Sequence, residues 1–586
     1  IMSSGTMLSC KMALSRRCVR AVLLSVAVQF LLLAIFLLFV NFELWHPLQW
    51  VAGTFRLVCS FYTWFASIPL IGAVVFYGVT LSQQHLAERR YCSTRYRWML
   101  NNGPRKILFL GAHLLVGYLT AWLYAGYLHS DYRHLLYRCY GQDCLSSYHV
   151  FLLGMGIAAG CYYFVSVHLH HEVSIDYAIV EQSRSQKLRE LLFSTFKGAP
   201  ISSLLPTLSY SLVFALLGGF VRQRLGHLLG VDVDDRLVGI LDVATNVRLL
   251  FYAWLLSSQI LSNMHLMKRF YAMLLSEQLP LVVSRNRLVS HKQQQQLTVV
   301  TGLGLFNVYV VQCLTAHFLY IESKRKDSPV RLEIFQLTEP GNRPVNWREL
   351  CDQCVYIVGN FTDELSDSMR QVSVVKSNDE HPTAAHSDVN AALLAEKALL
   401  RQYNHMYGIR SVVAQSSETT PEHRQQWQQA KPSESIRHVP TWCERVSIQL
   451  EESLQRLLHR IPGIIYLFGE PEGAKTLFLL EHSLPIVWLT QALAHICVAS
   501  LKEDRYGVVQ DDLPTIIKTL HRLKSELDKL SNSNASNLKS ASVILNYLRC
   551  AVRRSLYNVC DSFYNYLEDI IAGEELLQLQ SFVHHG

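Results

Sequence analysis

The chain has 586 residues, of which 50% are hydrophobic and only 17% are charged, whereas ordinary soluble proteins carry about 25% charged residues. The apolar bias is concentrated in residues 21–262, which contain long uncharged runs, and this excludes a wholly soluble protein. The fourteen cysteines follow no repeating framework, which excludes a small disulfide-stapled secreted fold. The net charge of +8 fits basic cytoplasmic loops better than a dedicated nucleic-acid-binding surface.

Six apolar segments are long enough to form helices that cross a hydrocarbon core of about 30 Å. They are residues 21–40, 57–81, 107–128, 148–167, 204–221 and 243–262. Four basic residues precede the first segment and no small-residue cleavage site follows it, so we interpret it as an uncleaved signal anchor. The sixth segment is the most polar, with Arg248 near one end.

The orientation of these segments follows from the lysines and arginines near their ends. Alternate loops place nineteen basic residues on one side and six on the other. Basic residues favour the cytoplasmic side, so we expect a cytoplasmic segment at residues 1–20, a six-helix transmembrane domain at 21–262 and both termini outside the lumen. Cys139 and Cys144 then lie in a lumenal loop, either as a disulfide, worth at most about 3 kcal/mol for so short a loop, or as two free thiols.

The remaining residues are more polar and have a helical pattern, which gives an all-α fold class overall. Residues 297–321 have the length of a seventh span but carry many polar residues, so we interpret them as a buried soluble helix. We expect a juxtamembrane helical region at 263–372, a disordered linker at 373–440 with a helical island at 389–407, and a C-terminal α-helical domain at 441–586. Further helices are expected at 444–461, 474–501, 513–530 and 545–570.

Motifs that would carry chemistry are weak in this sequence. Residues 469–476 resemble a phosphate-binding loop but have Ala474 where the motif needs glycine. The histidines that begin at His168 are interpreted as interfacial, and the pair Cys351 and Cys354 as buried helical residues. The sequence therefore predicts no enzyme, no cofactor, no metal site, no small-molecule substrate and no direct contact with nucleic acid. A transporter, a channel or a lipid-modifying membrane enzyme remains the alternative.

Gly156 and Gly160 form a GxxxG motif in the fourth apolar segment. Small residues at this spacing let two helix backbones approach closely in lipid. We interpret the motif as packing within the bundle, with self-association as the alternative.

Two longer motifs resemble signatures of a known family. Residues 337–347 read Leu-Thr-Glu-Pro-Gly-Asn-Arg-Pro-Val-Asn-Trp, and residues 499–510 read Ala-Ser-Leu-Lys-Glu-Asp-Arg-Tyr-Gly-Val-Val-Gln, followed by Leu513-Pro514. With six spans and a large helical C-terminal region, the chain resembles the animal six-span transmembrane nucleoporins of the nuclear-division-cycle (Ndc) family. Residues 373–440 match this resemblance poorly.

The resemblance implies a structural membrane anchor of the nuclear pore complex, in the nuclear envelope, that is needed for pore assembly and so for mRNA and protein transport. Its implied partners are inner-ring scaffold nucleoporins, ALADIN, other pore-membrane proteins and membrane lipid. In the signatures, Gly341 and Gly507 suit turns that need positive φ, and Pro340 and Pro344 would stiffen the loop. The other signature residues form either a helix-end structure or a partner surface: Trp347, Glu503, Asp504 and Arg505.

Overall fold

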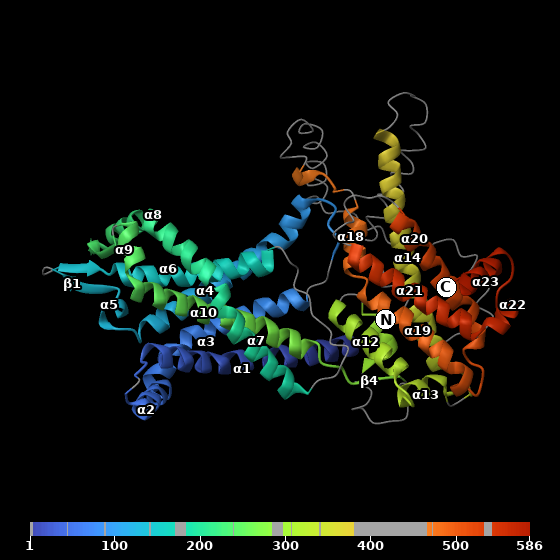
Figure 1. Cartoon of the computed structure of the whole chain (residues 1–586). Helices are drawn as coiled ribbons and strands as arrows, with labels where there is room; N and C mark the ends of the chain where they lie inside the picture. The colour runs from blue at the N-terminus through green and yellow to red at the C-terminus, as the bar shows by residue number, and fades with distance from the viewer. Residues whose placement is uncertain are drawn as a thin grey trace. The chain divides into compact units, whose positions relative to one another are not determined.

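The computed structural model describes residues 4–43, 45–86, 90–139, 142–169, 183–237, 239–283, 297–305, 308–338, 341–379, 466–471, 473–532 and 542–585. The fold is almost entirely α-helical (Figure 1), which confirms the all-α prediction. The chain forms two compact units, and each is described by itself. The bundle unit comprises Lys11–Ala87 and Asn102–Glu277; the C-terminal unit comprises Ile1–Cys10, Glu88–Asn101 and Gln278–Gly586.

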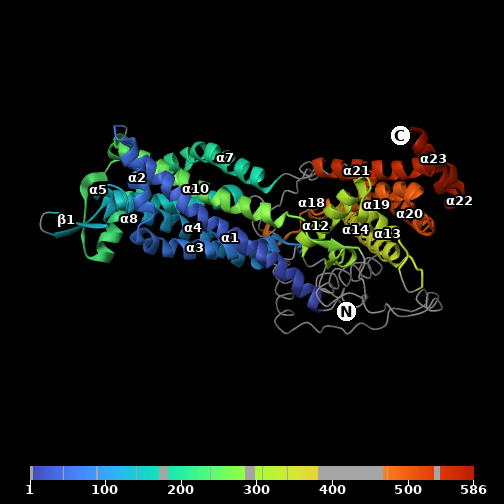
Figure 2. The ribbon, with the colours of Figure 1, turned by 90° about the horizontal axis from the view of Figure 1, so that it is seen from below.

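The long helices of the bundle unit run side by side (Figures 1 and 2). Its helical elements are α1 (Ser4–Val40), α2 (Pro47–Val58), α3 (Phe61–Leu86), α4 (Arg95–Ala125), α5 (Ser130–Arg133), α6 (Ser147–Tyr163), the π-helix η1 (Phe164–Leu169), α7 (Arg184–Ser202), α8 (Leu204–Leu229), the 3-10 turn η2 (Asp235–Leu237), α9 (Ile240–Thr245) and α10 (Val247–Leu275). The first residues of α1 and α4 belong to the C-terminal unit.

Six described helical segments are long and apolar enough to cross a membrane. They are Met12–Val40, Phe61–Leu86, Arg95–Ala125, Ser147–His168, Arg184–Leu229 and Leu484–Glu503. The first five coincide with predicted spans, but the predicted span at 243–262 is not among them, and Leu484–Glu503 takes its place. The span at 243–262 lies on α10, whose buried face carries several polar side chains that lower its hydropathy: Ser257, Ser258, Gln259, Ser262 and Asn263.

One residue of this polar face, Asn263, pairs with a side chain on α1. The Gln29 side-chain amide donates to Asn263 Oδ1 at 2.5 Å, and the Asn263 amide donates to Gln29 Oε1 at 3.1 Å. The Arg17 guanidinium donates to the carbonyl oxygen of Glu277 at 2.5 Å, just beyond the end of α10. An apolar cluster joins the same two helices: Val28, Leu32, Leu266 and Phe270. Since α10 also packs against α3, α6, α7 and α8, it is the central helix of this unit.

Small residues bring α4 and α6 into backbone contact. A Cβ added at Gly156 would lie 2.5 Å from the carbonyl oxygen of Gly117, and one added at Gly160 would lie 2.5 Å from the carbonyl oxygen of His113. Neither position has room for a methyl group, so the structure uses the GxxxG motif for packing inside the bundle unit.

A small sheet joins two loops at one end of the bundle unit. Strands β1 (Leu136–Cys139) and β2 (Gln142–Leu145) are antiparallel, and β3 (Asp232–Val233) is parallel to β2. The Arg222 guanidinium reinforces this end by donating to Ser147 Oγ at 2.8 Å and to the carbonyl oxygen of Leu237 at 2.5 Å. Cys144 is disulfide-bonded. The side chain of Cys139 lies outside the described part of the structure, so the pairing of these two cysteines stays a prediction.

The C-terminal unit is built around α19 (Leu484–Glu503), which packs against α12, α13, α14 and α21. The other elements are the parallel pair β4 (Leu281–Val282) and β5 (Leu297–Thr298), α11 (Val299–Leu303), α12 (Tyr309–Lys324), α13 (Pro329–Phe335), α14 (Val345–Asp379), α18 (Ala474–Glu481), the 3-10 turn η4 (Gln510–Asp512), α20 (Leu513–Asn532), α21 (Ser542–Ser562), the 3-10 turn η6 (Tyr564–Tyr566), α22 (Leu567–Ile570) and α23 (Glu574–His585).

Several expected helix limits differ in the structure. The single helix expected at 297–321 is two helices, because α11 ends at Leu303 and α12 begins at Tyr309. The helix expected at 474–501 is likewise divided into α18 and α19, and α14 continues to Asp379, past the expected start of the linker. The helical island at 389–407 and the helix expected at 444–461 lie outside the described residues, and the domain limits stay predictions.

We predict that Gly160→Ala lowers the thermal unfolding midpoint of the full-length protein in detergent. The added methyl group would overpack the contact between α4 and α6, at a cost of about 1–3 kcal/mol. Gly111→Ala is the matched control on α4, since a Cβ there meets nothing within 4 Å and alanine favours the helix by about 0.5–1 kcal/mol. Equal midpoints for the two variants would contradict the packing role of Gly160.

Candidate functional site

The two sequence signatures meet in the C-terminal unit. The loop before α14 carries the first signature, and the segment from the end of α19 through η4 carries the second. The indole Nε1 of Trp347 donates to Asp512 Oδ2 at 3.0 Å, and Trp347 is fully buried. An exposed ion pair of 3.8 Å joins Arg348 to Asp511 beside this contact. We call the region where these residues meet the signature junction.

A bidentate ion pair joins Glu503 to Arg331 on α13. Arg331 Nε donates to Glu503 Oε2 at 2.6 Å, and a terminal nitrogen donates to Oε1 at 2.5 Å. Arg331 is only 7% exposed, and its remaining terminal nitrogen donates to the carbonyl oxygen of Ser323 at 2.7 Å. Removing the carboxylate would leave a buried guanidinium without its counter-charge, so Glu503 holds the end of α19 against α13.

The loop of the first signature is a tight turn. The backbone N–H of Thr338 donates to the carbonyl oxygen of Arg343 at 2.9 Å, and between them Gly341 has φ +112° and Asn342 has φ +47°. Glycine pays no steric penalty at such positive φ. Pro344 precedes α14, and Asn346 donates to the carbonyl oxygen of Glu333 at 3.2 Å. These contacts set the position of Trp347. Pro340 lies outside the described residues.

Asp504 closes the turn of the second signature. Its two carboxylate oxygens accept from the backbone N–H groups of Tyr506 and Val509, each at 3.0 Å. Gly507 has φ +65°, and its carbonyl oxygen accepts from the N–H of Gln510 at 3.2 Å. Asp504 is therefore used within the fold to link α19 to η4.

Other side chains of the second signature are exposed at the surface of the C-terminal unit. Arg505 is exposed, as are the apolar side chains of Leu501 at 49% and Tyr506 at 63%. Within the described residues, no ion pair or hydrogen bond is formed by the Arg505 side chain. Arginine and tyrosine are enriched at the energetic centres of protein interfaces. We call Leu501, Arg505 and Tyr506 the signature rim, and it is an exposed part of the second signature.

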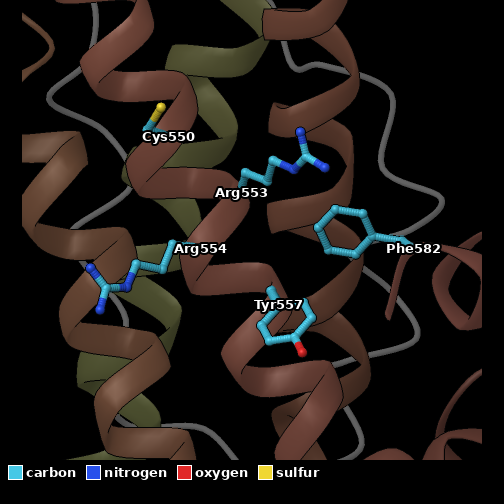
Figure 3. A pocket seen from close by; sticks show the side chains of 5 residues that line it. All are labelled: Cys550, Arg553, Arg554, Tyr557 and Phe582. Carbon is cyan, nitrogen blue, oxygen red and sulfur yellow. The ribbon is translucent and has the colours of Figure 1, made fainter. Parts of the chain in front are cut away.

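A second exposed feature is a cavity of about 260 Å³ between α21 and α23. Figure 3 shows Arg553 and Phe582 extending toward each other, with Tyr557 beside them. The Arg553 guanidinium carbon lies 5.7 Å from the centre of the Phe582 ring, and Lys524 Nζ lies 5.1 Å from it. This basic and aromatic cavity suits an acidic side chain of a partner.

The weaker sequence motifs are structural in the described residues. Cys351 and Cys354 are buried in α14, and burial raises the pKa of the Cys354 thiol to about 12 and that of Cys351 as well. Thr476 is buried and bonds to Ser368 at 3.0 Å between hydroxyl oxygens, so it does not face a phosphate. The His168 side chain is buried, 5.2 Å from His113 between ring centres, and its depth relative to the membrane surface stays a prediction. Across the described ranges, no group of three or more His, Cys, Asp or Glu could hold a metal ion.

Sequence reasoning missed four of the residues that make these contacts: Arg331, Arg348, Asp511 and Asp512. Arg331 lies outside both motifs, and no sequence signal pairs it with Glu503, which is 172 residues away. Arg348 follows the first motif directly, Asp511 and Asp512 follow the second, and no periodicity in the sequence indicates that the two segments meet.

Residues 12–579 match the protein family described as Nucleoporin protein Ndc1-Nup. The chain is 61% identical to Nucleoporin Ndc1 of Drosophila melanogaster over 583 residues, which is 99% of each chain. It is 22% identical to Nucleoporin NDC1 of Homo sapiens over 94% of this chain and 93% of the relative. It is also 26% identical to Nucleoporin ndc-1 of Caenorhabditis elegans, over 42% of this chain and 37% of that relative.

We predict that Glu503→Ala destabilises the C-terminal unit by about 3–5 kcal/mol, the usual cost of breaking a buried ion pair. Arg505→Ala, its matched control two residues away, should change stability by less than about 0.5 kcal/mol, as for other exposed positions. Chemical unfolding of the full-length protein in detergent, with hydrogen exchange measured at α13 and α19, compares the two. Comparable losses in both variants would mean that Arg505 also belongs to the fold.

Proposed function

This chain belongs to the nucleoporin family Ndc1-Nup, and from that premise we propose that it anchors the nuclear pore complex to the pore membrane and is needed for pore assembly. It is a component of the nuclear pore complex, and its family implies a structural rather than a catalytic role. The bundle unit is the membrane part of the anchor. The C-terminal unit is the part that recruits other pore components.

Contacts within the C-terminal unit support α10 as the sixth span. Arg95 at the start of α4 donates to the carbonyl oxygen of Tyr466 at 3.1 Å, and Tyr96 packs 4.7 Å from Phe468 between ring centres. Segments that touch in this way must lie on one side of a membrane. Between Arg95 and Tyr466 the chain must therefore cross the membrane an even number of times. Crossings by α4, α6, α7–α8 taken as one, and α10 make an even number, whereas leaving out α10 makes the number odd.

Contacts at both ends of the bundle unit agree with this crossing number. Arg17 near the start of α1 reaches the backbone after α10, so these two ends share a side. Strands β2 and β3 pair, so the loops that carry them share the other side. Six crossings satisfy both conditions.

The apolar composition of α19 can be explained although this helix does not cross the membrane. Trp347 and Ser368 on α14 contact Asp512 and Thr476, which lie on either side of α19 in the sequence. Helix α14 carries many charged residues and is unsuited to lipid. The segments before and after α19 both contact α14, so both lie outside the membrane on the same side as α14. An apolar helix enclosed by other helices is typical of a protein core.

We predict that both termini face the cytoplasm or nucleoplasm. Protease added to sealed microsomes should remove a tag at the C-terminus and spare a tag inserted at Asp131, because the membrane protects the lumenal loops. A tag inserted after Lys326, between α12 and α13, is the accessible control. Protection of the C-terminal tag would mean an odd number of crossings or the reverse orientation, and either would refute the prediction.

The proposed partners of the C-terminal unit are inner-ring scaffold nucleoporins, ALADIN and other pore-membrane proteins. The signature rim and the cavity between α21 and α23 support this role, since both expose arginine with aromatic side chains. The single observation that carries the proposal is the family match over residues 12–579. Through pore assembly, the anchor would serve transport of mRNA and protein.

We predict that the fluorescently tagged full-length chain gives a punctate nuclear rim and co-purifies with scaffold nucleoporins. Arg505→Glu combined with Tyr506→Ala should lower that recovery by more than about tenfold, the effect of losing an interface centre. Arg553→Glu tests the cavity separately, and Lys518→Glu on the exposed face of α20 is the charge-reversal control.

A reticular or plasma-membrane signal from the unsubstituted chain would overturn the anchor itself. Normal recovery with both variants would instead leave the anchor standing and move the contact surface elsewhere.

A further inference from the structure

A groove of about 760 Å³ lies on the bundle unit between α1, α3 and the first part of α4. Its walls are apolar side chains that are exposed in the structure: Val19 (57%), Leu23 (63%), Val75 (40%) and Val79 (48%). Its volume falls within the range of sites that hold small-molecule ligands, about 300–1,000 Å³. The groove therefore differs from the flat apolar surface of an ordinary span.

The two ends of the groove differ in polarity. Ser15 on α1, Gln83 on α3 and Arg105 on α4 line one end. Leu23 and Val75, one or two helical turns further along α1 and α3, line the other. The polarity along the groove therefore matches the polarity along a phospholipid, whose polar headgroup lies at the membrane surface and whose apolar acyl chain extends into the membrane.

Arg105 gives the polar end a positive charge. It is exposed, and within the described residues its guanidinium has no ion pair or hydrogen bond. Arg16 and Arg20, which are also exposed, lie on the neighbouring turns of α1. A phosphate or carboxylate in the headgroup would be held by charge-assisted hydrogen bonds, which arginine can make in pairs.

Contacts that reach Val22, which lines the groove, fix the helices around it. A Cβ at Gly78 would lie 2.7 Å from a methyl group of Val22 and 2.7 Å from the hydroxyl of Tyr271, so only glycine lets α1, α3 and α10 close together here. The Tyr271 hydroxyl donates to the carbonyl oxygen of Gly78 at 2.8 Å. Because these contacts hold α1 and α3 together, the groove between them is formed before a ligand binds.

We propose that this groove binds one anionic phospholipid, with the headgroup at Arg105 and an acyl chain between α1 and α3. The inference rests on the proposed placement of the bundle unit in the membrane. It concerns a lipid that the protein selects and holds, beyond the bulk lipid that surrounds any span.

The test uses full-length protein in phosphatidylcholine nanodiscs that contain a photoreactive phosphatidylserine or, separately, the matching photoreactive phosphatidylcholine. After cross-linking, labelled peptides are mapped by mass spectrometry. We expect phosphatidylserine to label the peptides around Val19 and Val79 in preference to phosphatidylcholine. Arg105→Gln should lower this labelling roughly tenfold, as expected for the loss of one charged contact. Val79→Trp should lower it by filling the channel.

Two controls match these variants. Arg189→Gln removes an exposed arginine on α7, and Val213→Trp enlarges an exposed valine on α8; neither should change labelling of the groove. Equal labelling by the two lipids, or labelling unchanged by Arg105→Gln, would overturn the proposal. These results would leave the membrane anchor intact, whereas failure of the protein to insert into nanodiscs would refute the anchor itself.

Discussion

The buried pair of amides between Gln29 and Asn263 joins α1 to α10, the helix on which the other helices of the bundle unit pack. An unpaired amide in an apolar interior costs several kcal/mol, and α10 carries five polar residues on its buried face. Because α1 supplies a partner that both donates and accepts, α10 can occupy the centre of the unit and contact α3, α6, α7 and α8. The positions of those four helices depend on this central one. Membrane helices commonly use such side-chain hydrogen bonds across their interfaces.

The sequence located five of the six helices whose length and hydropathy would let them cross a membrane. It differs from the hydropathy of the folded helices at α10, which was expected to cross, and at α19, which was not. Helix α10 is packed against α3, α6, α7 and α8 and can therefore carry buried polar residues that lower its hydropathy, so its place as the sixth span stays a proposal. Helix α19 is apolar because other helices of the C-terminal unit enclose it. The hydropathy of a helix indicates that it is buried from water, but it does not indicate whether the helix is surrounded by protein or by lipid.

The signatures were visible in the sequence, but their association was not. Positive φ at Gly341 and Gly507 could be anticipated because tight turns need glycine. The contact of Trp347 with Asp512 joins residues 165 positions apart, and no periodicity predicts such a pair. Glu503, Asp504 and Arg505 look alike as a charged triplet, yet their environments differ. Two of them hold backbone or side chains within the unit, and only Arg505 is exposed without such a contact. That distinction requires the fold.

The division of the chain also has a mechanical consequence. The C-terminal unit includes residues from three separate stretches, so the polypeptide passes between the two units four times: after Cys10, Ala87, Asn101 and Glu277. A pulling force on a soluble domain joined by one linker is carried by a single strand of backbone. Here the same load is shared among four strands. A cut in any one of them leaves the other three connections to carry tension between the two units.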